Sequence, residues 1–352
     1  MKTLTFFNNK GGVGKTTLTV NIASYLTSKL EKRVIVLDAD PQANSTQMVI
    51  KQDEWENFYG EQAHRNTVRD MFVPIKLGER AINPSIDIIR GNEHEFHFDL
   101  IAGDPSLSII EDILSSAWEE GKSGNAGGIR TTNWLNLLKK RFESEGYDYL
   151  IIDVGPSLGA LNRSILLNSD YIITPMGSDI FSLMGIKNIA DWIHEWRRVY
   201  LNGLSYCVAL QQPQAIAQYQ INNDLSKTTK LAGYSIQQYN SRKFKTGYRP
   251  VKAYDEIINQ IPGVIYETLK FIIPSRLQED NKLNLGDVPY LNSIIPMAQS
   301  NNTPLFNLNS THGIRGAQSL NVEQYSHMLD NICQNLIRNI SLSEEESGDT
   351  SD

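Results

Sequence analysis

The sequence predicts a doubly wound α/β fold, a mostly parallel sheet with helices on both faces and with insertions. Short, uninterrupted apolar runs at 4–7, 34–37, 149–152 and 171–173 are typical of strands buried on both faces of a parallel sheet. Stretches with apolar residues at helical spacing, such as 18–26, separate these runs. The alternation of the two patterns indicates strands joined by crossover helices.

A glycine-rich turn connects the first strand to the first helix. Its residues are Lys10, Gly11, Gly12, Val13, Gly14, Lys15, Thr16 and Thr17. The glycines let successive backbone amides point inward, and the helix N-terminus adds partial positive charge, so the turn suits phosphate groups. Lys15 adds a full charge for the β- and γ-phosphates of a nucleotide, and the Thr16 hydroxyl can ligate magnesium. Asn9 replaces the first glycine of the usual phosphate-loop pattern.

Acidic residues directly follow two of the predicted strands. Asp38 and Asp40 come after the run 34–37, and Asp153 follows 149–152. Because ligands of a doubly wound sheet lie at the carboxyl ends of its strands, we expect these carboxylates beside the phosphates. A carboxylate at this place helps to hold the magnesium ion that bridges the phosphates. Taken alone, the acidic pair also fits a simple helix cap.

The composition is that of an ordinary globular protein, with 352 residues, 40% hydrophobic and 21% charged. The net charge of −7 means that any contact with nucleic acid depends on a local basic patch. The two cysteines, Cys207 and Cys333, are far apart, which predicts a reduced, cytoplasmic setting. No apolar run approaches the roughly 20 residues of a membrane span. The first strand begins too early for a signal peptide, so we expect a soluble protein.

The middle of the chain gives weaker signals. The polar and aromatic stretch from 48 to 63 fits an amphipathic helix over the edge of the core, or an insertion that binds a partner. Strands are expected at 86–89 and 99–103, and a helix with one apolar face is expected at 107–118. The glycines of 121–128 indicate a flexible linker, because no strand precedes the Gly-Lys-Ser sequence there as a phosphate loop requires.

The densest basic patch follows a weaker strand candidate at 231–236. Its cations, interleaved with Phe244 and Tyr248, are Arg242, Lys243, Lys245, Arg249 and Lys252. Such a patch can contact the phosphate backbone of DNA without regard to base sequence, with an affinity that falls steeply with salt. A solvated loop is the alternative, since a run of charges usually marks an exposed surface.

The segment Lys10–Thr16 resembles the deviant phosphate loop of the ParA/MinD family of partition and positioning ATPases. The resemblance implies a P-loop fold in which the extra lysine, Lys10, reaches across a dimer interface to the partner's nucleotide. The segment Asp38–Asn44 is similar to the family motif D-x-D-P-Q-x-N, in which Asp40 orients the attacking water and Asp38 lies near the magnesium shell. ATP would then hold two subunits face to face.

Two later segments extend the resemblance. The segment Asp153–Leu161 is similar to the family switch D-x-P-P-S-L-G, and Gly155 replaces the first proline, a change that would loosen the loop. The segment 293–297 is similar to the late strand and loop that pack on the adenine. The resemblance therefore implies adenine contacts by Pro296 and Met297.

We expect one ParA-like domain at 1–340, with insertions near 48–66 and 203–230. A final helix with one apolar side is predicted from 322 to 337. The acidic stretch 341–352 is expected to be a disordered tail. It differs from the basic amphipathic membrane anchor in which MinD relatives end, so no membrane contact is expected.

The resemblance implies a slow ATPase that uses magnesium and acts as a switch. An ATP-bound homodimer would bind DNA non-specifically at the nucleoid, and a protein partner of the centromere-binding type would stimulate hydrolysis. Its role would be partition of a plasmid or chromosome, or positioning of another cargo. Two alternatives remain, a regulator that binds a protein partner without DNA and a MinD-like membrane switch. An iron–sulfur role, as in the nitrogenase iron protein, is disfavoured because no cysteine closely follows Asp153.

Overall fold

The computed structural model describes most of the chain. The described residues are 1–61, 63–210, 213–239, 241–244, 247–250, 252–280, 282–289 and 294–349. Within these ranges the side chains are described except at 238–239, 241–244, 247–250, 252–254, 279, 289 and 347–349. The side chains of Arg242, Lys243 and Arg249, and all of Lys245, therefore lie outside the described part, so the predicted DNA contacts stay a prediction.

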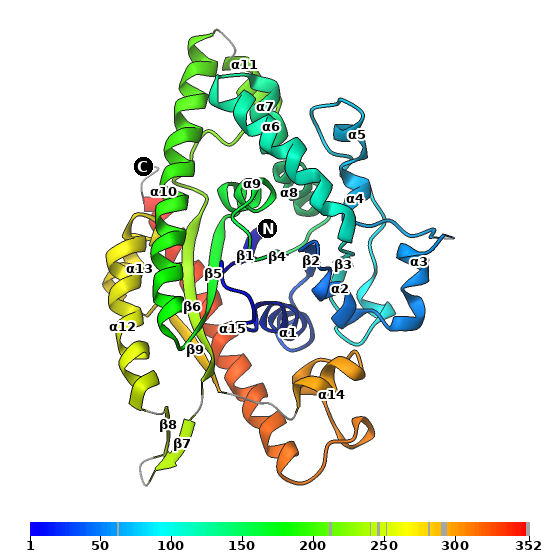
Figure 1. The fold of residues 1–352 in the computed structure, drawn as a ribbon, viewed down its shortest axis with the longest axis vertical. Coiled ribbons are helices and arrows are strands. Elements are labelled where there is room, and N and C mark those ends of the chain that lie inside the picture. Colours follow the sequence, from blue (N-terminus) through cyan, green and yellow to red (C-terminus); the bar gives the residue numbers. More distant parts are fainter. Residues whose placement is uncertain are drawn as a thin grey trace.

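Seven strands form one parallel sheet with helices on either side (Figure 1). Their order is β3-β2-β4-β1-β5-β6-β9, and every neighbouring pair is parallel. Their bounds are β1 (Lys2–Phe6), β2 (Val34–Ala39), β3 (Asp99–Ile101), β4 (Tyr149–Val154), β5 (Tyr171–Gly177), β6 (Lys230–Tyr239) and β9 (Asn284–Pro289). A separate antiparallel ladder pairs β7 (Ser241–Phe244) with β8 (Gly247–Pro250). The predicted doubly wound parallel fold is confirmed.

Helices fill the connections between these strands. They are α1 (Lys15–Ser28), α2 (Asn44–Val49), α3 (Glu56–Tyr59), α4 (Val68–Met71), α5 (Val73–Lys76), α6 (Ile110–Lys122), α7 (Ala126–Thr132), α8 (Leu135–Ser144), α9 (Ala160–Asn168), α10 (Ile180–Ala209), α11 (Pro213–Gln218), α12 (Lys252–Leu269), α13 (Ser275–Asp280), α14 (Ile295–Ser300) and α15 (Ala317–Asp349). Short 3₁₀ turns lie at Gln52–Glu54, Gly91–Glu93, Pro105–Ile109, Lys270–Ile272, Leu305–Asn307 and Ser310–His312.

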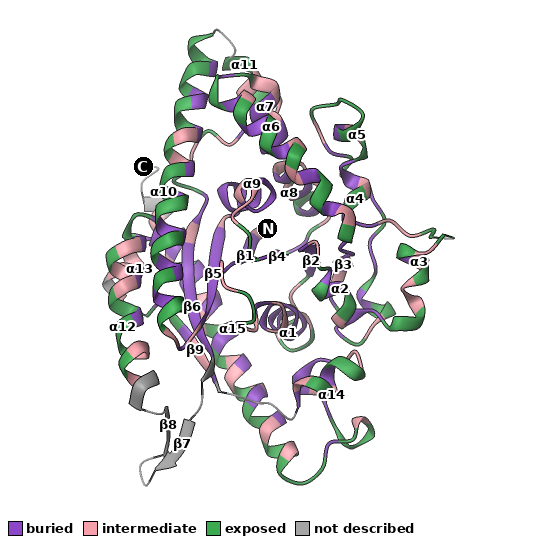
Figure 2. Cartoon of the chain, viewed as in Figure 1, coloured by how far each residue is buried: buried purple, intermediate pink, exposed green. Residues whose placement is uncertain are grey.

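Each face of the sheet has its own apolar core. One core joins Ile35 and Leu37 of β2 to helices α6, α8, α9, α10 and α12. The other joins Val34 and Val36 of the same strand to α1 and α15. Successive side chains of a strand point to opposite faces, so one uninterrupted apolar run supplies both cores. Figure 2 shows the strands buried, whereas the helices expose their outer sides.

Two expectations for the region before β3 are wrong. Residues 86–89 form no strand, and Ile89 makes only an isolated bridge with Leu100. The stretch 48–63 forms short helical turns instead of one amphipathic helix, because the extended backbone of Ile50 ends α2. The strand predicted from 99 is present as β3.

Two further differences come from close packing and from a strand end. The predicted flexible linker at 121–128 is the tight corner between α6 and α7, where a Cβ on Gly128 would lie 2.5 Å from the Ala117 carbonyl oxygen. Strand β5 continues beyond the predicted run 171–173 and through Pro175 to Gly177. Since β1 stops at Phe6, it does not reach the proline, and the missing N–H breaks no hydrogen bond to that strand.

The C-terminal helix runs further than predicted. Helix α15 continues to Asp349, so most of the expected disordered tail from 341 is helical. Ser343 is buried, and Glu344 forms an ion pair with Lys2 at the start of β1. These contacts hold the end of the helix against the sheet. In the described ranges no helix is both long and apolar enough to cross a bilayer.

Candidate functional site

The predicted phosphate loop joins the end of β1 to the start of α1. Gly12 and Gly14 have left-handed backbone angles, with φ of 74° and 73°, which glycine adopts without strain. The Asn8 side chain fixes the loop by accepting from the Lys10 backbone N–H at 2.9 Å and donating to the Pro175 carbonyl at 2.7 Å. The result is a fixed turn at the N-terminus of a 14-residue helix, an arrangement that binds phosphate.

Lys15 is the buried cation of this loop, with 8% of its surface exposed. Its ammonium group donates to the Val154 carbonyl at the end of β4. Burial lowers the pKa of Lys15, and the carboxylate of Asp153 is the strongest of the influences that oppose this shift. Because this ammonium is largely removed from water, an anion that reaches it from the loop interacts strongly with it.

Asp153 lies at the carboxyl end of β4 and is fully buried. Its Oδ2 accepts from the Ser45 hydroxyl at 2.8 Å, whereas its Oδ1 has no hydrogen-bond partner in the described part of the chain. Burial raises the pKa of Asp153, while Lys15, Ser45 and Thr16 favour its ionised form. An unpartnered, buried carboxylate oxygen near the Thr16 hydroxyl is a feature that a bound cation would satisfy.

The side chains of Thr16 and Asp153 fit a magnesium ion in particular. Magnesium takes oxygen ligands and usually receives only one or two from the protein, with phosphates and water supplying the rest. No group of three or more His, Cys, Asp and Glu side chains is placed to hold a metal ion among the residues that the structure describes. The donor set therefore favours a metal that arrives with phosphates.

Asp38 lies outside the cavity lining and is fully buried. Its Oδ2 accepts from the backbone N–H and the hydroxyl of Thr46, at 2.8 and 2.7 Å. Burial, followed by the charge of Asp153, raises the pKa of Asp38 to about 8. A Cβ on Gly103 would lie 2.8 Å from the Asp38 carboxyl carbon, so glycine is needed for this close approach. Asp38 thus holds α2 against the strand ends.

Asp40, by contrast, lines the cavity. Its Oδ1 accepts from the Gln42 backbone N–H at 2.9 Å, which fixes the direction of the carboxylate. A Cβ on Gly155 would lie 3.2 Å from the same oxygen, so the small residue permits the close approach of Asp40. The Asn162 amide donates to the carbonyls of Gly155 and Ser157, both at 2.8 Å. The loop is therefore fastened, although a glycine replaces the proline of the motif.

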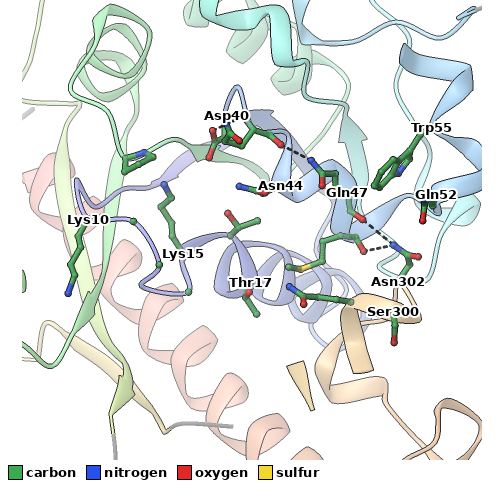
Figure 3. Close-up of a pocket in the computed structure, with 18 residues that line it drawn as sticks. Lys10, Lys15, Thr17, Asp40, Asn44, Gln47, Gln52, Trp55, Ser300 and Asn302 are labelled. Atoms are coloured by element: carbon green, nitrogen blue, oxygen red, sulfur yellow. Dashed lines mark hydrogen bonds between the residues drawn. The ribbon is translucent and has the colours of Figure 1, made fainter. Parts of the chain in front are cut away.

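A cavity of about 650 Å³ opens over the phosphate loop (Figure 3). Its lining consists of Lys10, Gly11, Gly12, Gly14, Lys15, Thr16, Thr17, Asp40, Gln42, Asn44, Gln47, Met48, Gln52, Trp55, Pro156, Gln299, Ser300 and Asn302. The charged side chains of this lining belong to the loop and to the strand end beside it. Figure 3 shows Trp55 and Gln52 across the cavity from Lys10 and Lys15.

The structure brings most of the predicted nucleotide contacts to this cavity, but not all of them. Of the loop residues, Val13 is buried and stays outside the lining. Pro296 and Met297 lie on α14 and also stay outside it. Because this segment is a helix, residues of the next turn, Gln299 and Ser300, face the cavity instead.

Lys10 stands at the rim of the cavity and pairs with Asp179, the cap residue of α10. In Figure 3 its ammonium group points away from Lys15 and Asp40. Burial opposes ionisation of Asp179, but the hydrogen bond and the charge of Lys10 outweigh it and lower the pKa of that carboxyl. In this conformation Lys10 directs its charge away from its own loop.

Several residues of the site carry no recognisable motif. Ser45 and Thr46 hold the two buried carboxylates, and their position directly after the acidic segment is a signal that could have found them. Trp55 comes from a stretch with no clear pattern. The Asn302 amide donates to the Gln47 carbonyl, which lies 255 positions away in the sequence. No local sequence pattern predicts this contact.

More than half of the chain matches the model of one known protein family. A family model described as an AAA domain, AAA_31, matches residues 1–205, more than half of the sequence. The chain belongs to the AAA_31 family. The AAA_31 match contains the phosphate loop, Asp40 and Asp153, and it ends within α10, so β6, β9 and α15 lie beyond it.

Relatives of this AAA_31 protein include a plasmid ParA family protein and a chromosome-partitioning ATPase. The virulence plasmid ParA family protein pGP5-D of Chlamydia psittaci is 31% identical over 193 residues, which cover 54% of this chain and 63% of that protein. The chromosome-partitioning ATPase Soj of Thermus thermophilus is 26% identical over 190 residues, which cover 54% of this chain and 60% of that protein. The chain thus spans less than two thirds of either relative. The predicted membership of the ParA/MinD-type Walker ATPases is confirmed.

Solved structures match nearly the whole chain. Protein DIP2308 from Corynebacterium diphtheriae has a TM-score of 0.73 and 26% identity, and the match covers 97% of this chain and 99% of that one. A variant of McdA from Cyanothece, solved in complex with ATP, has a TM-score of 0.58 at 17% identity and covers 96% of both chains. The second likeness shows the fold alone, and it extends that fold beyond the part that the family model matches.

Proposed function

We propose that this protein is an ATP-dependent, dimerising switch ATPase of the ParA type, which converts ATP and water to ADP and phosphate. The observation that carries the proposal is the convergence of the phosphate loop, Lys15 and Asp40 on one end of a single cavity. A fixed loop with a desolvated cation is arranged for the β- and γ-phosphates of a nucleotide. Turnover is slow until a protein partner of the centromere-binding type stimulates it.

The residues of this end have distinct roles in the proposed reaction. Lys15 neutralises charge on the phosphates, and Asp40 orients the attacking water. Thr16 and Asp153 would hold a magnesium ion, which when bound would neutralise charge on the β- and γ-phosphates. Asp38 acts indirectly, because one of its carboxylate oxygens already accepts two hydrogen bonds from Thr46.

The surroundings of Lys10 support a dimer. Lys10 stands at the rim of its own cavity with its ammonium group turned toward Asp179, next to an apolar patch at the start of α10. The patch residues Ile180, Phe181 and Met184 are 53%, 67% and 56% exposed. An exposed apolar patch at the mouth of a site is typical of a protein interface. In the proposed dimer Lys10 leaves Asp179 and reaches the phosphates held by the partner, so ATP joins the two subunits.

The ATP-bound dimer would bind DNA non-specifically, and hydrolysis would release it. Since the net charge is −7, this contact depends on the basic patch of Arg242, Lys243, Lys245 and Arg249. One named relative is a chromosome-partitioning ATPase and another is a ParA family protein of a virulence plasmid, which supports a role in partition or in the positioning of another cargo. The protein would then work in the cytoplasm, at the nucleoid.

The test uses Asp40→Ala, a variant expected to bind ATP without turning it over. Size exclusion with light scattering should give a dimer with Mg²⁺-ATP, and a monomer with ADP or without nucleotide. Electrophoretic shift of plasmid DNA should require ATP and weaken at the higher of two salt concentrations. A monomer in ATP would overturn the switch, and a dimer that ignores DNA would favour the regulator that binds only a protein partner.

A charge-reversal pair tests the DNA patch within this experiment. The double variant Arg242→Glu with Lys245→Glu should lose the DNA shift and keep the ATP-dependent dimer. Lys76→Glu with Lys140→Glu, on α5 and α8, changes the net charge equally and is the matched control. If both double variants bind DNA as the wild type does, the contact lies elsewhere on the surface. Pelleting with anionic liposomes in ATP checks the membrane alternative.

A further inference from the structure

The end of the cavity opposite the phosphate loop carries no nucleotide-binding motif. We propose that it is a nucleobase site, in which the base of a nucleoside triphosphate stacks on Trp55 and is contacted by the side-chain amides of Gln52 and Gln299. This inference rests on the proposed function, because phosphates at the loop would direct the base toward this end. It names the part of the site that selects the ligand.

The cavity has two chemically different halves. Lys10, Lys15 and Asp40 stand at the loop end. The opposite end is uncharged, and its side chains are Gln47, Met48, Gln52, Trp55, Gln299, Ser300 and Asn302. A nucleoside triphosphate has the same division, with its charges on the phosphates and a neutral planar ring at the other end. The cavity volume of about 650 Å³ lies within the range of small-molecule sites.

The orientation of Trp55 in the cavity wall is fixed by its contacts with the protein. It packs against the apolar core of α1 and α15, and it also lines the cavity. Its indole N–H donates to the Ile50 carbonyl at 3.1 Å, so its polar group is already satisfied within the protein. The cavity therefore meets the apolar ring of a side chain whose orientation is fixed. Aromatic rings of this kind stack on nucleobases.

Hydrogen bonds join the two chain segments that form the uncharged end of the cavity. The Asn302 amide donates to the carbonyls of Gln47, Met48 and Ile50, at 3.2, 3.1 and 3.2 Å. Its backbone is left-handed, with φ of 44°, a conformation that asparagine adopts more readily than most residues. These bonds join the chain after α14 to the end of α2. A binding surface assembled in advance loses less entropy when its ligand arrives.

The uncharged end of the cavity also contains side-chain amides that are available to hydrogen-bond a ligand. In the described part of the chain the side-chain amides of Gln52 and Gln299 make no hydrogen bond to the protein, and both line the cavity. Gln47 differs, because its amide donates to the Gln42 carbonyl at 2.7 Å. A free amide offers two donors and one acceptor, which suits the mixed donors and acceptors at the edge of a base.

The test separates the two ends of the cavity with two ligands. Calorimetry on the full chain measures the affinity for Mg²⁺-ATP and for Mg²⁺-tripolyphosphate, which lacks a base. Trp55→Ala should weaken ATP binding about tenfold and leave tripolyphosphate binding unchanged. The matched control is Trp192→Ala, which removes a 45% exposed tryptophan of α10 outside the lining and should change neither affinity.

A second variant keeps the outcome decisive. Trp55→Phe retains an aromatic ring and should keep most of the ATP affinity, which also guards against a fold that tolerates no alanine. Equal ATP affinity of the wild type and Trp55→Ala would overturn the base site, and so would equal losses for both ligands in both Trp55 variants. A wild type that binds neither ligand would instead remove the proposed function itself.

Discussion

The two ends of the cavity are built in opposite ways. The phosphate end comes from one short stretch, 10–17, and from strand ends beside it, and its charged groups are largely buried. The neutral end joins two distant segments, 47–55 and 299–302, through hydrogen bonds of Asn302. If the proposed function holds, the desolvated charges would decide whether a nucleotide binds and reacts, and the assembled neutral groups would decide which nucleotide is bound.

The largest effect is expected at the phosphate end, from Asp40→Ala. Asp40 lines the cavity with its carboxylate fixed by the Gln42 N–H. Loss of the group that positions the attacking water should lower ATP hydrolysis by about 100-fold or more, while ATP still binds. Steady-state phosphate release and a binding isotherm measure the two quantities. Asp53→Ala, on an exposed turn outside the lining, is the control. Unchanged hydrolysis in Asp40→Ala would assign the water to another residue.

The next effect concerns the cation at the rim. Lys10→Ala should leave ATP binding by the monomer nearly intact and weaken ATP-dependent dimerisation by about 30-fold or more, because a desolvated charge contact across the interface is lost. Sedimentation at several protein concentrations measures the dimer affinity. Retained dimerisation would mean that Lys10 acts only within its own subunit.

The partner of Lys10 gives the converse variant. Asp179→Asn removes the ion pair that holds Lys10 away from the loop, and both side chains of that pair are 33% exposed. Ion pairs this exposed contribute about 1 kcal/mol or less, so dimerisation should tighten by only a few-fold. A weaker dimer in Asp179→Asn would show that the carboxylate itself belongs to the interface.

At the neutral end of the cavity, the expected effect is mainly on folding stability. Asn302→Gly keeps the left-handed backbone but removes three donated hydrogen bonds. We expect the free energy of unfolding to fall by about 1–3 kcal/mol and the ATP affinity to fall by a similar or smaller amount. Urea unfolding and calorimetry provide the two values. Asn223→Gly, at an exposed loop asparagine whose side chain makes no hydrogen bond in the described structure, controls for the added chain flexibility. If both variants behave alike, the hydrogen bonds of Asn302 do not shape the base site.

The smallest effect on stability is a pH dependence, which comes from a histidine in the core beneath the neutral end of the cavity. His94 packs on Phe96 and Phe98 of the core that also supports Trp55. Burial, reinforced by His97, lowers the pKa of His94 to about 4. A histidine in the unfolded chain has a pKa near 6.5. At pH values between these two pKa values, the unfolded chain therefore binds a proton at this histidine and the folded chain does not. Stability is complete above this range and falls with falling pH, by roughly 1 kcal/mol at pH 5.5.

Urea unfolding at pH 7.5 and 5.5 checks this dependence. His94→Phe removes the titrating group and also a buried nitrogen without a hydrogen-bond partner in the described structure. The wild type should lose more stability than His94→Phe when the pH falls. An equal loss would mean that other groups set the acid sensitivity.

Local patterns explain how much of this protein could be predicted from its sequence. The run 34–37 with Asp38 and Asp40 after it, and the glycine-rich turn before Lys15, fix both their conformation and their chemistry within a few residues. The parallel sheet and the carboxylates beside Lys15 followed from these patterns. Loops defined by glycine and by strand ends are therefore predictable.

The remaining features depend on contacts between distant segments. Strand β9 contains Gly286 and ends with Pro289, residues that weaken a strand pattern and are tolerated here because β9 lies at the edge of the sheet. Trp55 and Asn302 come together at the Ile50 carbonyl, which accepts a hydrogen bond from each of these side chains. Pro296 and Met297 were expected on the adenine because a motif places them in a loop, whereas here they begin a helix that turns later residues to the cavity.

The most direct measurement of the central claim is a calorimetric titration of the purified full chain with Mg²⁺-ATP. The account predicts binding of one nucleotide per chain, and no measurable binding in Lys15→Ala under the same conditions. A wild type that takes up no Mg²⁺-ATP at saturating concentration, or a Lys15→Ala variant that binds it unchanged, would contradict the account.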